Sequence, residues 1–269
     1  MDKKLDIVAL GEILIDFTPY GKSDEGNVLF EQNPGGAPAN LLVAATRFGA
    51  RTAFIGKVGQ DQFGYYLKDI LDGIHVGTTG LVFTEKANTT LAFVHLNSEG
   101  DRSFSFYRKP GADILIDIED LNEDLLSGAK VFHFGSLSLT HEPARSTTIH
   151  AVKYVKQKGS IISYDPNWRP GLWSSHEESV YWMKKGTQYA DIIKVSEEEL
   201  ELITGEADLE KGSNMLAKMG PKVIFVTLGG EGCYYRINKG TGHVPSYKVP
   251  VIDTTGAGDS FFGSMLYQI

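Results

Sequence analysis

Short apolar runs alternate with longer amphipathic segments along most of this chain. The first apolar run, residues 7–10, ends at a glycine, which is typical of a strand buried on both faces of a sheet. Segments 38–48 and 61–72 carry apolar residues at helical spacing, with Pro38 suited to a first helical turn and Asp61 to an N-cap. Further strands are expected at 52–56, 81–83, 130–134, 160–164, 191–194, 222–227 and 233–237, and further helices at 141–158, 174–188, 197–203, 208–219 and 261–269. This alternation predicts an α/β fold with a mostly parallel sheet covered by helices on both faces.

One region departs from the alternation. Residues 89–97 and 102–108 have the pattern of two strands joined by a turn at 98–100, and no helix separates them. Strand-like pieces near 13–19 and 28–31 are expected to join this hairpin in a small separate sheet. We therefore expect one domain over residues 1–269, with a β-sheet lid formed by roughly residues 12–35 and 87–112.

Composition narrows the possible partners. With 269 residues and 42% hydrophobic content the chain can bury a sizeable core. The net charge of −8 and the lack of a basic run disfavour nucleic acid as a partner. The single cysteine, Cys233, excludes an intrachain disulfide and a cysteine-based zinc site. The start of the chain is too short for a signal peptide and no apolar run reaches membrane-spanning length, so we expect a cytoplasmic protein that does not bind membranes.

Candidate chemistry is concentrated near residues 253–259. After an extended run at 247–252, Gly256, Ala257 and Gly258 form a small-residue turn at the start of a predicted helix. Helix-start N–H groups attract anions, and small residues allow a ligand to approach the backbone. Asp259 follows this turn, where a carboxylate could accept a proton from a hydroxyl while the turn holds a transferring phosphoryl group. These residues alone fit a simple helix N-cap at Asp259 equally well.

Two motifs together are more specific. GGAPAN at residues 35–40 and DTTGAGD at 253–259 resemble the two signatures of the ribokinase-like (PfkB) carbohydrate kinases. The resemblance continues, in family order, through Gly11-Glu12 with Asp16, GKVGQDQFG at 56–64, FYRKPGAD at 106–113, DPNWRPGLW at 165–173 and VTLGGEG at 226–232. It therefore spans the whole chain. The pair FYRKPGAD and DPNWRPGLW looks most like the fructokinase branch.

The resemblance implies a three-layer α/β/α sandwich with a small β-sheet lid over the sugar. It implies that Asp259 is the base that takes a proton from a primary hydroxyl, and that the backbone of Gly256, Ala257 and Gly258 forms the anion hole. It assigns sugar hydroxyls to Asp16, Gly36 and Asn40. A carboxylate and a carboxamide can both bind hydroxyl groups, and a glycine lets the sugar approach the backbone.

Other candidates come from the ends of predicted strands. Tyr107 and Arg108 end the lid hairpin and are expected to contact the sugar, the alternative being a solvated lid edge. Arg169 is a candidate for a phosphate or sugar oxygen, or else for a surface salt bridge. Thr227 and Gly229 resemble the family's nucleotide contacts, although a plain hairpin turn would also explain them.

The residues expected to bind metal ions depart from the family pattern or match it only in part. Many members carry Asn-x-x-Glu after the sixth major strand, tied to Mg²⁺ and phosphate, whereas residues 196–199 here are SEEE. The resemblance then leaves Glu199 to act on Mg²⁺ through water and Lys194 to contact phosphate, with a solvated helix face as the alternative for the glutamates. Asp253 and Thr255 match part of the family's monovalent-cation (K⁺) site. Members usually continue with helices that wall the adenine pocket, and we expect these C-terminal helices to be absent from this sequence.

The leading hypothesis is an ATP-dependent sugar kinase that converts fructose to fructose 6-phosphate with Mg²⁺. 2-Keto-3-deoxygluconate, ribose or a nucleoside remain alternative substrates, and a non-catalytic sugar or nucleotide sensor is the alternative from another class. A dinucleotide-binding oxidoreductase is disfavoured because no G-x-G-x-x-G follows the first strand. Apolar residues on the lid predict a homodimer through that sheet; they are Leu91, Phe93, Phe104 and Phe106.

Overall fold

The computed structural model describes residues 3–96, 102–251 and 253–269, so the turn expected at 98–100 lies outside the described residues. The larger sheet contains β1 (Leu5–Leu10), β4 (Thr52–Gly59), β5 (Gly77–Thr84), β8 (Ala129–Gly135), β9 (Ile161–Asp165), β10 (Ile192–Ser196), β11 (Val223–Thr227), β12 (Cys233–Ile237) and β13 (Gly240–Val244). Their order is β13-β12-β11-β10-β9-β8-β1-β4-β5. Pairing is parallel from β5 to β11, and β12 and β13 add to that edge in antiparallel fashion.

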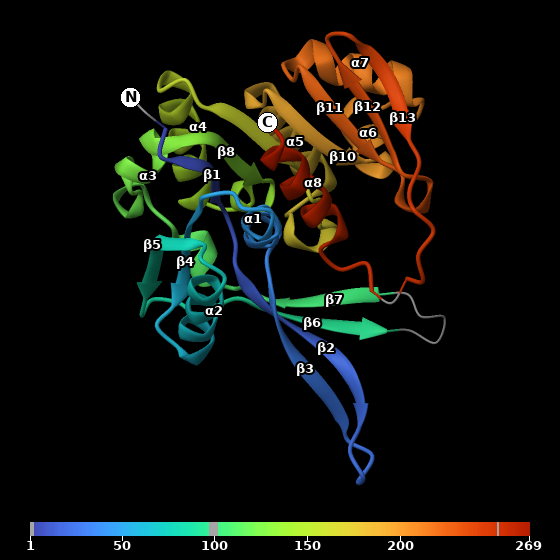
Figure 1. Cartoon of the computed structure of the whole chain (residues 1–269). Helices are drawn as coiled ribbons and strands as arrows, with labels where there is room; N and C mark the ends of the chain where they lie inside the picture. The colour runs from blue at the N-terminus through green and yellow to red at the C-terminus, as the bar shows by residue number, and fades with distance from the viewer. Residues whose placement is uncertain (1–2, 97–101, 252) are drawn as a thin grey trace.

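Helices cover both faces of this sheet (Figure 1). They are α1 (Ala37–Arg47), α2 (Gln62–Gly73), α3 (Glu123–Gly128), α4 (Ala144–Gln157), α5 (His176–Tyr189), α6 (Glu197–Thr204), α7 (Leu209–Met219) and α8 (Ala257–Tyr267). Alternate residues of β1 point into different cores: Ile7 packs with α1, α2 and α8, and Val8 packs with α3 to α7. The predicted three-layer α/β/α sandwich is therefore confirmed. No helix within the described ranges is both long and apolar enough to cross a bilayer.

The lid is a second, four-stranded sheet. It contains β2 (Leu14–Lys22), β3 (Val28–Gly35), β6 (Leu91–Leu96) and β7 (Arg102–Tyr107), in the order β3-β2-β6-β7. Figure 1 shows the β2–β3 hairpin projecting away from the larger sheet, while β6 and β7 run beside the body. The predicted small sheet is present, and its two N-terminal strands are longer than the pieces expected near 13–19 and 28–31.

Three local predictions differ from the structure. Residues 247–251, most of the run expected to be extended, pair with no described strand, and their side chains are exposed. The last helix begins at Ala257 and not at residue 261, because Gly256 takes a left-handed φ of 72° and caps it. The strand β13 was missed because its sequence, GTGHV, lacks the apolar alternation of a strand and is ordered by pairing with β12.

A buried ion pair fixes the lid to the body. Asp113 accepts hydrogen bonds from Thr90 Oγ1 at 2.6 Å and from Arg108 Nε at 2.7 Å, so it joins the residue before β6 to the residue after β7. Arg108, only 4% exposed, also donates to Thr140 Oγ1 and to the carbonyl of Leu137, both at 3.0 Å. These two acceptors lie in the loop that follows β8. Both lid strands are thereby held at one point of the body.

The substitution Asp113→Ala is expected to lower the free energy of unfolding by about 3–5 kcal/mol, because it leaves the buried Arg108 guanidinium without its counter-charge. Denaturant-induced unfolding measures this change. The matched control is Lys68→Ala, which removes an exposed (i, i+4) ion pair with Asp72 and should leave the midpoint nearly unchanged. Equal effects of the two substitutions would show that the buried pair does not anchor the lid.

Candidate active site

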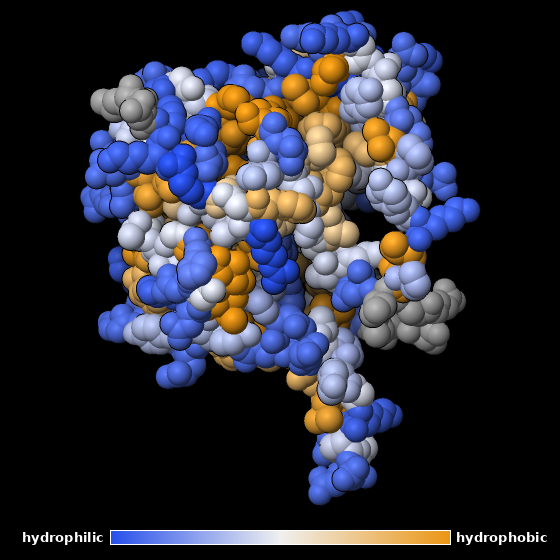
Figure 2. Space-filling view, in the orientation of Figure 1, coloured by the Kyte–Doolittle hydropathy of each residue, from blue (hydrophilic) through white to orange (hydrophobic). Residues whose placement is uncertain are grey.

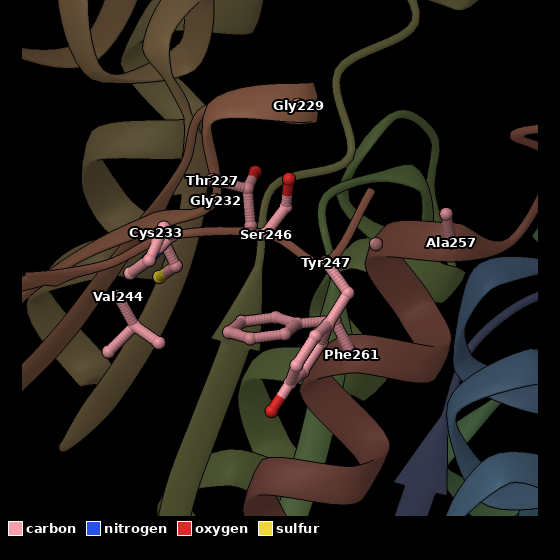
Figure 3. Close-up of a pocket in the computed structure, with 11 residues that line it drawn as sticks. Thr227, Gly229, Gly232, Cys233, Val244, Ser246, Tyr247, Ala257 and Phe261 are labelled. Atoms are coloured by element: carbon pink, nitrogen blue, oxygen red, sulfur yellow. The ribbon is translucent and has the colours of Figure 1, made fainter. Parts of the chain in front are cut away.

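Two pockets meet at the turn that begins α8. The lid-side pocket is lined by residues that include Asp16, Gly36, Asn40, Arg169, Gly256 and Asp259. The strand-end pocket is lined by residues that include Thr227, Gly229, Tyr247, Ala257, Gly258 and Phe261 (Figure 3). A hollow between the body and the lid is visible in Figure 2. Asp259 therefore faces the lid-side pocket, whereas Ala257 and Gly258 face the strand-end pocket.

Close packing of α1 and α8 places Asp259. A Cβ at Gly263 would overlap the carbonyl oxygen of Leu41, so a larger residue at 263 would force the two helices apart. At this separation Asn40, in the first turn of α1, donates from Nδ2 to Asp259 Oδ2 at 3.0 Å. The sequence separation of these two residues is 219, so the contact depends entirely on how the helices pack.

A second amide holds the other oxygen of Asp259. Asn167 Nδ2 donates to Asp259 Oδ1 at 3.1 Å. Asn167 follows β9 and has a left-handed backbone with φ of 46°, a conformation in which Asn is enriched among non-glycine residues. Asn167 was not among the residues predicted for the site. The available signal was an Asn directly after Asp-Pro at a predicted strand end, a common setting for a left-handed residue.

Burial makes Asp16 and Asp259, two carboxylates of the lid-side pocket, weaker acids. Asp259 is 8% exposed, and burial, with the nearby charge of Asp165, raises its pKa to about 6 despite its hydrogen bond from Asn40. Burial likewise raises the pKa of Asp16 to about 6, although the Arg169 guanidinium acts in the opposite direction. A carboxyl group with a pKa near 6 is ionised at neutral pH and can still take up a proton readily, as a general base requires.

A buried ammonium lies beneath the turn. Lys194 is 7% exposed and pairs with Asp165, with Nζ 3.0 Å from Oδ2 and 3.2 Å from Oδ1. Burial opposes its charge, but Asp165 and Glu199 raise the pKa of Lys194 above its ordinary value. A Cβ built on Gly258 would lie 3.0 Å from this Nζ. Positive charge therefore adjoins the helix-start N–H groups, and the strand-end pocket suits a phosphate group there.

The predicted ion-binding residues have local partners. Glu199 Oε1 accepts from the backbone N–H of Trp168 at 2.7 Å, and Oε2 accepts from that of Ser196 at 2.8 Å in a capping box. Glu199 thus connects the loop after β9 to the start of α6 and does not lie on a solvated helix face. Asp253 Oδ1 accepts from the N–H of Thr255 at 2.7 Å, at the entry to the turn. Among the residues that the structure describes, no group of three or more His, Cys, Asp and Glu side chains could hold a metal ion.

The expected sugar contacts of Tyr107 and Arg108 are not supported. In the lid register Asp16, Ala92 and Phe106 are cross-strand neighbours on one face, so Tyr107, which alternates with Phe106, lies on the opposite face. Tyr107 is 66% exposed and packs edge-on against Phe93. Arg108 does not line the pocket, and it does not lie at a solvated lid edge either. Its guanidinium donates hydrogen bonds to Asp113 and to the loop after β8. Phe104 and Phe106 line the lid-side pocket instead.

A second residue that the analysis did not assign is Glu12. Its Oε1 accepts from the N–H of Ala37 at 3.1 Å, which connects the end of β1 to the start of α1. Burial raises the pKa of Glu12 to about 7. This carboxyl group helps to place Gly36 and Asn40 at the edge of the lid-side pocket.

Comparison with known proteins identifies the class to which this site belongs. Residues 4–269 match the pfkB family of carbohydrate kinases, and the chain belongs to that family. It is 47% identical over 266 residues to fructokinase-2 of Solanum habrochaites, covering 98% of this chain and 81% of that protein. It superposes on the crystal structure of a Xylella fastidiosa fructokinase with bound ATP with a TM-score of 0.90 and 37% identity, covering 98% of this chain and 80% of that one. A double mutant of the Vibrio cholerae fructokinase, solved with fructose, ADP and a potassium ion, gives a TM-score of 0.88 at 34% identity and covers 99% of this chain and 84% of that one.

The glycine at 36 offers a test of how tightly the pocket is built. Gly36 has a φ of 107°, and a Cβ there would lie 2.5 Å from the carbonyl oxygen of Glu12. Gly21 has a φ of 102° with no atom within 4 Å of its Cβ position. We expect Gly21→Ala to cost about 1–2 kcal/mol of unfolding free energy from backbone strain alone, and Gly36→Ala to cost roughly 1–3 kcal/mol more from the overlap.

Denaturant unfolding of the two variants measures this difference. The two glycines have nearly the same φ, so an excess cost at position 36 is expected to report mainly packing against Glu12. Indistinguishable unfolding of the two variants would mean that the pocket edge relaxes freely.

Proposed function

We propose that this protein is an ATP-dependent fructokinase that phosphorylates the primary hydroxyl of fructose to give fructose 6-phosphate. One observation carries the proposal: the turn at residues 256–259 separates two pockets, with the buried carboxylate of Asp259 on one side and helix-start N–H groups on the other. A phosphoryl group passing between two substrates requires this arrangement. Relatives named as fructokinases, at 46–47% identity and about four-fifths covered by this chain, support fructose as the sugar.

The chemistry follows from the positions of these groups. The sugar hydroxyl lies against Asp259, which takes its proton as the oxygen attacks the γ-phosphorus of ATP. The bond between that phosphorus and the β–γ bridging oxygen breaks, and ADP leaves. The backbone N–H groups of Gly256 and Gly258, with the Lys194 ammonium beneath them, stabilise the charge on the transferring group. The N–H of Ala257, which the resemblance also assigns to this anion hole, donates instead to the carbonyl of Thr254 at 3.1 Å. Thr227 and Gly229, in the strand-end pocket, bind the nucleotide.

The lid-side pocket combines polar side chains from both the lid and the body with aromatic rings from the lid. Asp16, Asn40 and Arg169 offer hydrogen-bond partners to sugar hydroxyls, Gly36 allows close approach, and Phe104 with Phe106 closes the pocket from the lid. Arg169 is the single arginine in that lining, so 2-keto-3-deoxygluconate, whose carboxylate needs such a partner, is the chief alternative. Ribose and nucleosides are further alternatives, and turnover over a sugar panel with ATP discriminates among them.

The residues also suit the ions expected for this reaction. Mg²⁺, which supplies charge neutralisation at the phosphates, is usually held by one or two carboxylates, waters and the substrate phosphates, so it needs no preformed protein cage. Glu199 is a candidate to reach it through water, and Asp253 with Thr255 to contribute to a K⁺ site. Loss of turnover on chelation and its recovery with Mg²⁺, with and without K⁺, tests these assignments.

We further propose a cytoplasmic homodimer through the lid. Exposed apolar side chains lie along the projecting β2–β3 hairpin (Figure 2), and they include Tyr20, Val28, Leu29 and Phe30. Exposed strands of this kind favour pairing with another sheet. The sedimentation mass of the protein in solution tests the dimer.

Asp259→Ala is expected to lower kcat by about 10²–10⁴-fold while leaving fructose binding close to that of the wild type, because it removes only the proton acceptor. Fructose-dependent ADP release measures turnover, and calorimetry measures sugar binding. Ser264→Ala, on the same helix but outside both pockets, is the control and should keep full activity. Near-normal turnover of Asp259→Ala would contradict the assignment, and fructose binding with no turnover in the wild type would favour a sugar sensor.

The pKa of Asp259 predicts an acid limit to activity. Burial raises the folded-state pKa to about 6, so below pH 6 the base becomes protonated and inactive. We expect kcat/KM for fructose to be flat above about pH 7 and to fall below pH 6 with a slope that approaches about tenfold per pH unit, and more steeply if Asp16 must also be ionised. A limb near pH 4, the ordinary range for aspartate, would show that the base is not buried in the working enzyme.

A further inference from the structure

We propose that Asn167 is a positioning residue for the reaction, which holds Asp259 in the orientation that receives the sugar proton and connects it to the ammonium beneath the phosphate-binding turn. The inference rests on the proposed function for its kinetic consequences. It assigns a role to a side chain that is itself part of the lid-side pocket lining.

Two amides hold the carboxylate of Asp259. Each oxygen of Asp259 accepts one amide N–H: Oδ2 from Asn40 at 3.0 Å and Oδ1 from Asn167 at 3.1 Å. One amide alone would leave the carboxylate able to rotate about its terminal bond. Two donors from separate elements, α1 and the loop after β9, fix the plane of the group and leave one further lone pair on each oxygen for a substrate hydroxyl.

Asn167 is itself held in place by Asp165. Its backbone N–H donates to Asp165 Oδ1 at 3.2 Å, in a turn that places the residue at φ 46°. Asp165 is paired with Lys194, whose Nζ lies next to Gly258. The base and the turn are therefore two ends of one chain of contacts: Asp259, Asn167, Asp165, Lys194, Gly258. This chain fixes the separation between the proton acceptor and the groups that hold the phosphoryl charge.

Asparagine suits a position that needs both a left-handed backbone and a side-chain N–H donor. A left-handed backbone is most easily adopted by glycine and, among other residues, by asparagine or aspartate. Glycine carries no donor, and aspartate would place a second carboxylate against Asp259. Among these three residues asparagine alone supplies both the conformation and the N–H. Four charged groups also lie near Asp259; they are Asp16, Asp165, Arg169 and Lys194.

The variant Asn167→Gly removes the side chain and suits the backbone. We expect kcat for fructose to fall roughly tenfold to a hundredfold, as a misplaced catalytic group typically costs, while KM changes much less. Because one hydrogen bond to the carboxylate is lost, the acid limb of the pH profile should move up by roughly one unit. Asn167→Asp should move that limb further in the same direction.

The matched control is His75→Gly. His75 is the other non-glycine residue with positive φ among the described residues, at 68°, and lies on the surface after α2. Glycine suits the local backbone at both positions, so both variants should remain folded. Asn167→Gly should unfold at a somewhat lower midpoint than the wild type, because it also loses a hydrogen bond to the buried Asp259 carboxylate. His75→Gly should keep wild-type kinetics. If Asn167 had a structural role alone, the two variants would have similar kcat values. Unchanged kcat in Asn167→Gly, or a loss confined to KM, would overturn the inference.

Titration of the Asp259 carboxyl by ¹³C NMR in the free protein separates this inference from the proposed function. Wild-type protein without fructose turnover would refute the fructokinase assignment, and the NMR titration would still test the contact. An Asp259 pKa that rises in Asn167→Gly supports the positioning role whatever the substrate. The same pKa in wild type and Asn167→Gly would overturn it.

Discussion

The close approach of α8 to α1 is the constraint on which the site depends. It is possible because Gly263 has no side chain to meet the carbonyl oxygen of Leu41. Through it Asn40 reaches Asp259, and the turn at 256–258 lies between the two pockets. Backbone packing of two helices, and not any property of Asp259 alone, therefore decides where a proton acceptor and an anion site meet.

Charge is distributed across this turn in a definite order. Asp16 and Asp259 lie on the lid side, where burial raises the pKa of each to about 6. Lys194 lies below, kept charged by Asp165. Buried ionised groups persist only with partners, and here the Asp165–Lys194 pair also joins the neighbouring parallel strands β9 and β10. The contacts that keep these groups charged are consequently also the contacts that hold the elements of the site together.

The lid has two faces with different tasks. One carries Asp16, Ala92 and Phe106 toward the pocket, and the other carries Phe17 and Phe93, which stack with centroids 4.9 Å apart. The period of two along a strand makes this division automatic once the register is set. At its base, the Arg108–Asp113 pair fixes the lid to the loop after β8, which also supplies Leu137 to the pocket.

The sequence by itself determined the fold class, the lid sheet and the family, because periodicity and ordered motifs are local properties of a chain. It also indicated Asp259, Asp16, Gly36 and Asn40, which the structure brings to one pocket. Only the tertiary structure decided the orientation of Tyr107, the burial of Arg108 and the partners of Glu199. Strand register orients Tyr107, and hydrogen bonds between residues 29 to 32 positions apart hold Arg108 and Glu199. Asn167 was missed for the same reason: its bond to Asp259 spans 92 residues and exists only once β9 and α8 are packed together.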